Sequence, residues 1–499
     1  MLLTNVNNPT STIELSRMHR VGLSRYTGLF LVIADSIALA ASALLANVIH
    51  YWLILRPDGS PFHEIWTITG ADTRLFVFAA LDLAAIAWFF QSGHYHKRRP
   101  FWDEIAQTTR ILAFLAAADA ITLYLLKLPF SRFWYLATWA LAIALVPVLR
   151  AFTKDLLIAM GLWQKPAFVL GTGSNARETV KALNSEPMMG LNPVAFIAPP
   201  GQTLEPDNSA NLPLPLITMD DVENLADDRA IRPPIFVALD DYGMVDNNVL
   251  IRRVRQLFRD IRIVPPVTGF PLYGAEVHHL FRQELFFLTL RNNLANRSTR
   301  IVKRGFDITV SILLLLVLSP LFLYLIARIK ADGGSAFFAH QRIGVDGKPF
   351  PCYKFRTMVP NAAEVLNALL QEDPEARREW QATFKLKNDP RVTKIGRFLR
   401  RTSLDELPQL WNVLVGDMSL VGPRPIVQAE LDRYGDDAFY YLEARPGITG
   451  VWQVSGRSDT DYPFRVYLDS WYVKNWSLWY DVVILIKTIR VVVNRAGAY

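Results

Sequence analysis

Four long apolar stretches in the first third of the chain restrict what it can fold into. They run over Leu29–Leu55, Leu75–Phe90, Ile105–Leu126 and Phe133–Leu149. A helix needs about 20 apolar residues to cross a bilayer, and these stretches lie near that length. The whole chain is 51% hydrophobic with a mean hydropathy of +0.17, which also favours a membrane protein. We therefore predict a four-helix transmembrane bundle over residues 1–160.

Basic residues beside these stretches predict how the bundle is oriented. The polar N-terminal segment carries Arg17, Arg20 and Arg25, and the loop 94–99 carries one lysine and two arginines. The chain is basic again after Arg150. Because positive residues accumulate on the cytoplasmic side of a membrane, both ends of the bundle are expected there. The polar start of the chain also predicts that it has no cleavable signal peptide.

Three carboxylates fall inside the apolar stretches, at Asp35, Asp82 and Asp119. An ionisable residue within a membrane marks a functional site, and the alternative is that these residues lie near the membrane interfaces or pair with each other and with nearby bases in the bundle. The sequence leaves both interpretations open and favours the second.

Residues 161–295 have the pattern of an α/β module. Short apolar runs predict strands at 167–170, 194–197, 235–239 and 261–264. Short strands that alternate with helical patterns are typical of a parallel sheet. We therefore predict a Rossmann-like module in this part of the chain.

A glycine-rich string follows the first of these strands. Gly171-x-Gly173-x-x-Ala176 matches the fingerprint that brings backbone N–H groups to a dinucleotide pyrophosphate. The usual partner is a carboxylate at the end of the second strand, but that strand ends in Ile197-Ala198-Pro199. The pattern favours a non-catalytic module, with nucleotide sensing as the alternative.

A fifth apolar run, Ile308–Ile329, is interrupted by Ser319-Pro320. Proline removes a backbone donor and clashes with the preceding turn, so the helix is expected to break or bend there. A full crossing would place everything after Lys330 outside the cell. We therefore predict a re-entrant helix that enters one leaflet and returns, with an ordinary fifth crossing as the alternative.

The remaining residues form the third predicted module, 296–499. Near its end, Trp471–Arg495 mixes tryptophans and aliphatics with charges that disfavour a crossing, which predicts an interfacial helix. The net charge of +7 is spread along the chain, and this distribution favours lipid and phosphate over nucleic acid as partners. The single cysteine, Cys352, excludes an internal disulfide and a thiolate metal cluster.

Basic side chains occur at several separate turns of this module. Guanidinium groups bind phosphate oxygens in a bidentate fork, so several such cations suit a diphosphate ligand. For any one of them a solvated surface position is the alternative. The candidates are Lys354, Arg356, Arg397–Arg401, Arg424 and Arg457.

One acidic pair, Asp405-Glu406, lies among these cations. Ser403-x-x-Glu406 is a capping-box pattern, which would make Glu406 only a helix-start residue. The alternative is chemical, because adjacent carboxylates at a helix start can act as nucleophile and metal ligand. Pro408 constrains the backbone just beyond, so the pair is expected at or near a helix N-terminus in either case.

The region from Lys303 to Tyr499 resembles the catalytic domain of bacterial polyprenyl-phosphate hexose-1-phosphate transferases, the monotopic phosphoglycosyl transferases. The order and combined length of the shared strings make the probability of a chance agreement very small. These strings are KFRTM at 354–358, TSLDELPQ at 402–409, GDMSLVGPRP at 416–425 and RPGITG at 445–450. The bundle and the middle module together resemble those of the large members of this family.

The resemblance implies a mechanism and roles for individual residues. Asp405 would attack the phosphorus that bears the sugar and release UMP, and Glu406 would help to hold Mg²⁺. Arg400 matches a phosphate-binding arginine, and Arg424 matches the arginine associated with the nucleotide. The family's re-entrant helix breaks at a Ser-Pro pair, which matches Ser319 and Pro320. Further substrate-binding residues transferred from the family are Lys354, Arg356, Arg457 and Asp469.

The family's substrates then define the expected partners. These are a UDP-sugar, undecaprenyl phosphate and membrane lipid, and a homodimer in a bacterial inner membrane is expected. Overall similarity favours galactose as the transferred sugar, with glucose next, in the first membrane step of O-antigen, capsule or exopolysaccharide synthesis. The catalytic domain is expected to be α-rich, with the re-entrant helix and interfacial helices.

Other activities fit the sequence less well. A nucleotide-sugar epimerase would need Tyr-x-x-x-Lys, and no tyrosine in this chain has a lysine four residues later. A glycosyltransferase metal motif could be built only on Asp459 and Asp461, a pattern that is common by chance. A non-enzymatic scaffold for polysaccharide assembly leaves Asp405, Glu406 and the arginines unexplained.

Overall fold

The computed structural model divides the chain into two compact units, Met1–Val267 and Thr268–Tyr499, each of which is described by itself. The finer division at residues 160 and 295 stays a prediction. The described residues are 26–55, 71–127, 131–199, 212–225, 233–240, 247–267, 269–270, 272, 274–279, 286–290, 293–294, 296–383, 386, 389–456 and 461–493.

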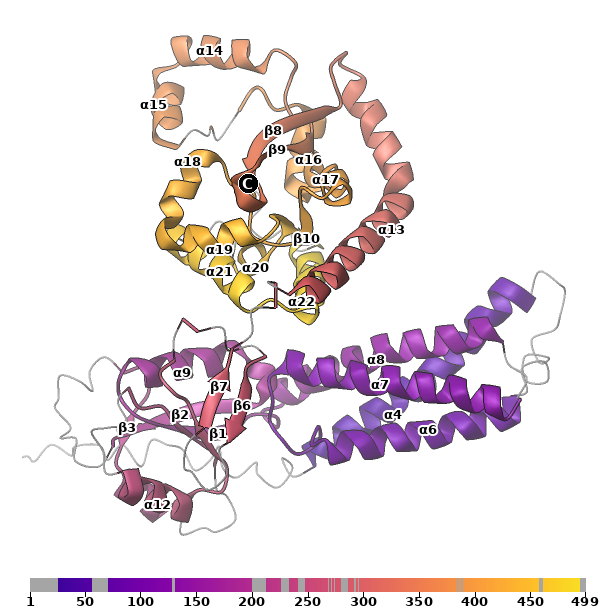
Figure 1. Cartoon of the computed structure of the whole chain (residues 1–499), viewed down its shortest axis with the longest axis vertical. Helices are drawn as coiled ribbons and strands as arrows, with labels where there is room; N and C mark the ends of the chain where they lie inside the picture. The colour runs from indigo at the N-terminus through magenta and orange to yellow at the C-terminus, as the bar shows by residue number, and fades with distance from the viewer. Residues whose placement is uncertain are drawn as a thin grey trace, which may run out of the picture. The chain divides into compact units, whose positions relative to one another are not determined.

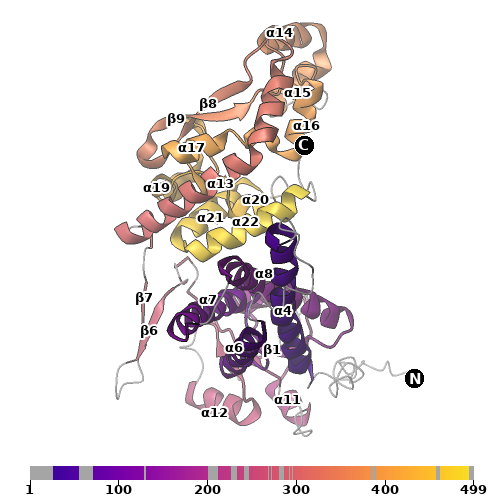
Figure 2. The same ribbon diagram turned by 90° about the vertical axis from the view of Figure 1, so that its right-hand side faces the viewer.

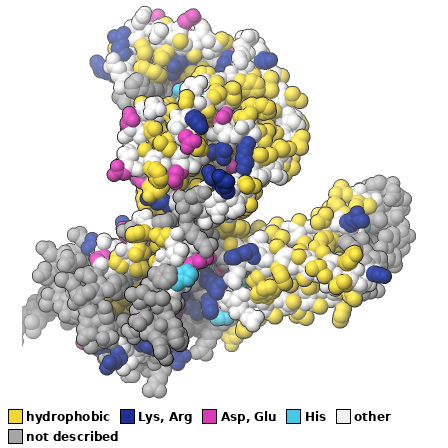
Figure 3. Space-filling model, viewed as in Figure 1, with side chains coloured by type: hydrophobic (Ala, Val, Ile, Leu, Met, Phe, Trp, Pro, Cys, Tyr) yellow, Lys and Arg dark blue, Asp and Glu magenta, His cyan; other side chains and the backbone are white. Residues whose placement is uncertain are grey.

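Four apolar helices form the first part of unit one, as predicted (Figure 1). They are α4 (Thr27–His50), α6 (Ala71–Gln91), α7 (Phe101–Leu125) and α8 (Arg132–Ala159). Helix α4 continues into a π-helical turn, Tyr51–Leu55. Three of the helices are long and apolar enough to cross a membrane, and α6 contributes a shorter apolar segment. Figure 3 shows that apolar side chains cover the outer face of these helices, as a lipid environment requires.

A buried ionic network holds the inner faces of the bundle together. Arg150 on α8 donates to both carboxylate oxygens of Asp35 on α4, at 2.7 and 2.6 Å. The same guanidinium lies 3.2 Å from Glu104 Oε1 on α7, and Lys154 donates to Glu104 Oε2 at 2.6 Å. The Tyr95 hydroxyl also donates to Asp35, at 2.8 Å. All four charged side chains are buried, so the charges compensate one another inside the protein.

The predicted pairing with a nearby base is therefore confirmed for Asp35. Asp35 pairs with Arg150, and Asp119 accepts a 2.8 Å hydrogen bond from Trp139 Nε1. Asp82 Oδ1 is buried and has no hydrogen-bond partner among the described residues.

A five-stranded parallel sheet follows the bundle in unit one, in the order β3-β2-β1-β4-β5. The alternation of side chains along β1 gives the sheet two apolar layers. Phe168 and Leu170 pack into one layer, and Ala167 and Val169 pack into the other. The strands are β1 (Lys165–Leu170), β2 (Leu191–Ile197), β3 (Leu216–Ile217), β4 (Ile235–Val237) and β5 (Ile261–Ile263), and the helices are α9 (Ser174–Ser185), α11 (Met219–Leu225) and α12 (Asn247–Leu257). The predicted mixture of helices with a parallel sheet is confirmed.

Unit two combines the long helix α13 (Arg297–Lys330) and several shorter helices with three two-stranded sheets (Figure 2). Its strands are β6 (Glu276–His279) with β7 (Phe286–Thr289), β8 (Phe337–Ile343) with β9 (Pro349–Phe355), and β10 (Ser419–Val421) with β11 (Gly447–Thr449). Its helices are α13 (Arg297–Lys330), α14 (Ala362–Glu372), α15 (Pro374–Thr383), α16 (Lys394–Thr402), α17 (Gln409–Val415), α18 (Gln428–Leu431), α19 (Ala438–Glu443), α20 (Val451–Val454), α21 (Tyr462–Lys474) and α22 (Leu478–Val493). Only the pair β10–β11 is parallel among these strands.

Helix α13 changes direction part-way along its length (Figure 1). Pro320 lies inside the helix and cannot donate to the carbonyl of Leu316. The hydroxyl of Ser319 donates to that carbonyl instead, at 2.8 Å. The Ser-Pro pair therefore bends the helix without leaving this carbonyl unpaired in an apolar segment.

The prediction of one continuous helix over Trp471–Arg495 is wrong. Helix α21 ends at Lys474 and α22 begins at Leu478. The reason is that Asp481 and Trp476 point inward: Asp481 is fully buried, and it binds Lys303 Nζ at 2.6 Å and Trp476 Nε1 at 3.1 Å. A charge that the sequence assigned to the membrane surface therefore belongs to the core of unit two.

Candidate active site

The acidic pair lies in a single 3-10 turn, Leu404–Glu406, between the end of α16 and the start of α17. Its predicted position near a helix N-terminus is confirmed. The capping box is not formed, because Ser403 has a left-handed backbone with φ of 55° and its side chain makes no capping hydrogen bond. The alternative in which Glu406 only starts a helix therefore loses its structural support.

Lys354 on β9 meets both carboxylates of the pair. Its Nζ lies 2.6 Å from Glu406 Oε1 and 3.9 Å from Asp405 Oδ2. Burial alone would lower the pKa of Lys354, but Glu406 and Asp405 outweigh it and raise that pKa. Lys354 is therefore a fixed cation beside two carboxylates at neutral pH.

The two carboxylates differ in exposure and so in chemical character. The Asp405 side chain is 14% exposed, whereas that of Glu406 is 37% exposed. Burial raises the pKa of Asp405 to about 6, against the opposing effect of Lys354. At neutral pH Asp405 is thus ionised but poorly hydrated, which suits a nucleophile.

Arg400 approaches from α16, one turn before the pair. Its Nε donates to Thr357 Oγ1 at 3.0 Å, which holds the guanidinium next to the strand end after β9. Helix α16 can lie this close because of Gly396, where a Cβ atom would come within 2.0 Å of the carbonyl oxygen of Thr357. The helix is therefore positioned by one glycine and one hydroxyl.

Arg424 follows β10 (Ser419–Val421). Its guanidinium carbon is 4.9 Å from the ring centre of Trp452. Burial and the neighbouring Arg465 lower the pKa of Arg424, and Glu406 is near enough to oppose that effect. Lys354 and Arg424 thus both contribute positive charge near Glu406.

Asp469 is buried, and its carboxylate accepts hydrogen bonds from neighbouring groups of unit two. Its Oδ2 accepts from the hydroxyl of Tyr434 at 2.8 Å, and the carboxylate also accepts from the backbone of Arg424. Burial raises the pKa of Asp469 to about 6. The structure therefore connects this predicted substrate-binding residue to the backbone that carries Arg424.

Arg356 points away from the pair. Its guanidinium donates to Asp332 and to the carbonyl oxygens of Ser335, Met358 and Ile329, the last three at 2.6, 2.9 and 3.1 Å. These bonds fasten the chain that follows α13. Arg457 and Asp459, in contrast, lie outside the described residues.

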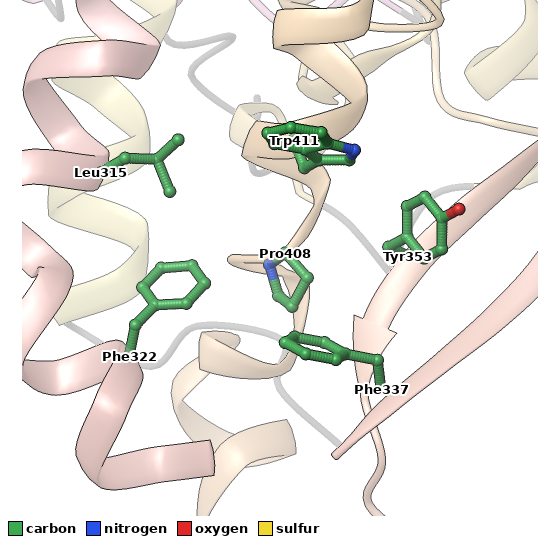
Figure 4. Close-up of a pocket in the computed structure, with 6 residues that line it drawn as sticks. All are labelled: Leu315, Phe322, Phe337, Tyr353, Pro408 and Trp411. Carbon is green, nitrogen blue, oxygen red and sulfur yellow. The ribbon is translucent and has the colours of Figure 1, made fainter. Parts of the chain in front are cut away.

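An apolar cavity of about 380 Å³ adjoins these elements (Figure 4). Leu315 and Phe322 face it from the two halves of the bent α13, and Phe337 faces it from β8. Pro408, two residues after Glu406, forms part of the opposite wall. The cavity is lined by Leu315, Phe322, Phe337, Tyr353, Pro408 and Trp411.

Asn412 is a residue that the sequence analysis missed. It is fully buried on α17, where its amide donates to the Pro351 carbonyl at 2.7 Å and its Oδ1 accepts from the Tyr353 backbone at 3.0 Å. Asn412 thereby fixes α17 against β9 and sets the distance between the acidic pair and Lys354. An asparagine in an apolar helix was the only sequence signal for this role.

The carboxylates of this site fit a magnesium ion that is held jointly by the protein and by the phosphates of a substrate. Mg²⁺ in phosphoryl transfer is usually held by one or two carboxylates together with substrate phosphates and water. Asp405 and Glu406 supply such carboxylates, and Lys354 uses only one oxygen of Glu406. No group of three or more His, Cys, Asp or Glu side chains could hold an ion within the described part of the chain. The site therefore suits an ion that a diphosphate helps to bind.

Comparison with known proteins agrees with this site. Residues 298–495 match the family model of bacterial sugar transferases. The chain is 48% identical over 431 residues to undecaprenyl-phosphate galactose phosphotransferase of Salmonella typhimurium, covering 86% of this chain and 89% of that protein. It is 41% identical over 467 residues to UDP-galactose-lipid carrier transferase of Erwinia amylovora, covering 93% and 95%.

A third relative shares a smaller part of the chain. UDP-glucose:undecaprenyl-phosphate glucose-1-phosphate transferase of Escherichia coli is 41% identical over 208 residues, which are 40% of this chain and 42% of that protein. The first two similarities extend over most of the molecule. The chain therefore belongs to the bacterial sugar transferase family, as an enzyme of polysaccharide synthesis in a membrane.

Proposed function

We propose that the protein transfers a hexose-1-phosphate from a UDP-sugar to undecaprenyl phosphate. The observation that carries this proposal is the partly buried Asp405 beside Glu406 and Lys354, on a turn that also adjoins an apolar cavity. A nucleophile between cations suits a diphosphate, and the cavity suits an isoprenoid chain. The names of the two long relatives support both substrates.

The reaction has two balanced steps. In the first, a carboxylate oxygen of Asp405 attacks the phosphorus that bears the sugar, and the bond from this phosphorus to the oxygen of UMP breaks. UMP leaves with the electron pair, and an aspartyl phosphosugar remains. In the second, a phosphate oxygen of undecaprenyl phosphate attacks the same phosphorus, and the bond to Asp405 breaks. The carboxylate is regenerated and the polyprenyl-diphosphate sugar leaves.

The cations of the site have separate tasks in this scheme. Lys354 keeps Asp405 ionised and offsets charge on the phosphoryl oxygens. Arg400 and Arg424 both bind the diphosphate, so that the leaving oxygen is held in line with Asp405. A bound Mg²⁺, held by Glu406 and phosphate oxygens, would neutralise charge on the diphosphate.

Galactose is the sugar we propose, and glucose is the alternative. The two relatives that extend over most of the chain carry galactose in their names, whereas the relative named for glucose shares 40% of the chain. The epimers differ at one hydroxyl, which a single hydrogen bond can read. A panel of UDP-sugars assayed with undecaprenyl phosphate distinguishes them.

The covalent scheme is tested without lipid. Purified protein incubated with a UDP-sugar and Mg²⁺ should release at most one equivalent of UMP and gain one sugar-phosphate mass on Asp405. Addition of undecaprenyl phosphate should remove this adduct and start turnover. Failure of the wild-type protein to form the adduct would contradict the scheme.

We further propose that α13 is re-entrant, so that unit two stays on the cytoplasmic face of the inner membrane. The support is the bend at Ser319-Pro320 and the few residues of this apolar helix that are buried within the protein. A helix that entered and left by one face would keep Asp405 on the side where nucleotide sugars occur.

Single-cysteine labelling can check this topology. Cys352 is buried and its thiol pKa is raised to about 11, so it gives little background. Cysteines placed at the exposed positions Ser298 and Ala331 flank the two ends of α13. An impermeant maleimide is expected to label both only after the cytoplasmic face is opened. Labelling of the two positions from opposite faces would establish a full crossing.

We also propose that the parallel sheet is a Rossmann-like module whose phosphate position is filled by the protein itself. Supporting this, β1 and β4 are neighbours at the point where the strand order reverses, and Asp240 follows β4. Asp240 accepts from the backbone N–H groups of Ser174 and Asn175 at 3.0 and 2.7 Å. A Cβ atom on Gly173 would lie 1.4 Å from this carboxylate.

Two results are expected from this arrangement. Asp240→Ala should destabilise unit one by about 1–2 kcal/mol, because it leaves N–H groups at the start of α9 without their acceptor. Asp240→Asn keeps an acceptor and should have the smaller effect. Thermal unfolding measures both, and added NAD⁺ should not raise the melting temperature of the wild-type protein. Stabilisation by the dinucleotide would overturn the interpretation.

A further inference from the structure

Two arginines of unit two lie against one indole ring. The guanidinium carbon of Arg424 is 4.9 Å from the ring centre of Trp452, and that of Arg465 is 5.1 Å from it. Arg465 comes from α21 and also lies 5.3 Å from the ring of Tyr462. We call Arg424, Trp452 and Arg465 the arginine–indole cluster. It joins residues from three separate elements and includes one arginine that no sequence pattern singled out.

Arg465 is buried without enough partners. The residue is 7% exposed, and its Nε and Nη2 have no hydrogen-bond partner among the described residues. The nearby carboxylate of Asp469 is already engaged, since it accepts from the hydroxyl of Tyr434 and from the backbone of Arg424. An unpaired buried N–H group is costly and a charged one is more so, which indicates that another acceptor completes this site.

The missing acceptor has a defined chemistry. A second cation, Arg424, is held beside the same ring, and one buried carboxylate, Asp469, acts on both guanidinium groups. Two guanidinium groups with one carboxylate leave a net positive charge that a further anion would offset. Arginine presents two parallel donors that match two phosphate oxygens. Water could fill hydrogen bonds, but it would leave the net positive charge unchanged.

The position of the cluster indicates which phosphate it receives. Arg424 is close enough to Glu406 for the charge of this carboxylate to raise its pKa, so Arg424 lies within electrostatic range of the acidic pair. With Asp405 at the phosphorus that bears the sugar, the other phosphorus of a diphosphate lies further along the substrate. Arg400 and Lys354 serve the reacting phosphoryl group, and Arg424 and Arg465 then remain for the departing one.

We propose that Arg465, together with Arg424, binds the phosphate of the nucleoside monophosphate that leaves during the transfer. This proposal rests on the proposed function and assigns a further substrate-binding residue to it. Arg465 contributes binding to the UDP-sugar and to the product UMP. It makes no contact with the lipid substrate.

UMP binding to the full-length detergent-solubilised protein tests this assignment directly. Arg465→Gln is expected to weaken UMP binding by about 10- to 100-fold, the range of a lost charge-assisted pair. Arg465→Lys keeps the charge and much of the packing, and it is expected to weaken UMP about tenfold while melting like the wild-type protein. The KM for the UDP-sugar should rise in both variants, with the KM for undecaprenyl phosphate unchanged.

Arg433 offers a matched control, because its guanidinium also lies over the ring of Tyr462, at 3.8 Å, but on the exposed surface. Arg433→Gln is expected to bind UMP like the wild-type protein. Wild-type affinity for UMP in folded Arg465→Lys and Arg465→Gln would overturn the proposal, as would an equal loss in Arg433→Gln.

The failure of this inference can be separated from failure of the proposed function. Asp405→Asn should still bind UMP while forming no adduct. If the wild-type protein forms no adduct but UMP binding still depends on Arg465, the covalent mechanism is rejected and the nucleotide site is retained. An adduct that forms on Asp405 together with UMP binding that ignores Arg465 would reject only the site.

Discussion

Asp405→Asn is expected to lower the rate of sugar-phosphate transfer by about 10³-fold or more, because removal of a covalent nucleophile leaves only binding and electrostatic effects. Asparagine has nearly the same shape as aspartate, but its side-chain amide is a much weaker nucleophile than a carboxylate. The variant should release no UMP from a UDP-sugar in the absence of lipid, and it should show no added mass. Mass spectrometry of the intact protein and a UMP assay measure both outcomes.

The loss must be shown to be chemical rather than structural. The pKa of Asp405 is raised to about 6 from an ordinary value of 3.8, so the folded protein binds this proton more tightly than the unfolded chain does. Ionisation of Asp405 between these two values therefore lowers stability as the pH rises. Asparagine cannot ionise, and the melting temperature of the variant at pH 7 should equal or exceed that of the wild-type protein.

A control acid separates the chemistry of Asp405 from a general loss of charge. Asp373 is exposed in the same unit and accepts from the backbone N–H groups of Glu375 and Ala376. Asp373→Asn keeps an acceptor there and should transfer sugar phosphate at the wild-type rate. Full turnover by Asp405→Asn, or an adduct on another residue of that variant, would contradict the assigned nucleophile.

The elements of this fold that could be predicted from sequence are those that local patterns determine. The apolar runs predicted the four bundle helices and strands β1, β2, β4 and β5, although α8 continues ten residues beyond the predicted end at Leu149. Strand β3 has only two residues, Leu216–Ile217, and its pairing with β2 depends on contacts across the sheet rather than on a pattern. The hairpin β6–β7 was missed for the same reason.

Individual arginines show more clearly what cannot be predicted from the sequence. Arg356 and Arg424 both lie in strings typical of the family, yet Arg356 bonds to Asp332 and Ile329, 24 and 27 residues before it. Arg424 instead lies against Trp452 and near Glu406. A sequence states which residues are basic, but the partner that uses up the donors of a guanidinium comes from tertiary structure.

The acidic pair was placed correctly for a reason that was partly wrong. Pro408 predicted the start of a helix, and α17 does begin at Gln409. The capping box failed because Ser403 ends α16 in a left-handed conformation, and its side chain makes no capping bond. Two short helices separated by one turn place Asp405 beside Lys354, at 3.9 Å.

The ionic network of the bundle predicts a large loss of stability when one of its charges is removed. Arg150→Met is expected to destabilise unit one by about 3–5 kcal/mol, because it leaves the carboxylate of Asp35 buried without its cation. The same change removes the hydrogen bond that Arg150 donates to the hydroxyl of Thr108, and it removes a positive charge beside Glu104. Resistance of the detergent-solubilised protein to heat or to SDS measures the loss.

Arg110→Met provides the matched control, because Arg110 is an exposed arginine of the same bundle that bonds only to the backbone of α7 in the described contacts. It should change stability by less than about 0.5 kcal/mol. The double variant Asp35→Leu with Arg150→Met removes both charges, and it should recover much of the lost stability, since the penalty comes from the unpaired carboxylate rather than from the missing pair. If the double variant is no more stable than Arg150→Met, the network stabilises the bundle mainly through its other bonds, and Glu104 with Lys154 becomes the pair that holds the helices together.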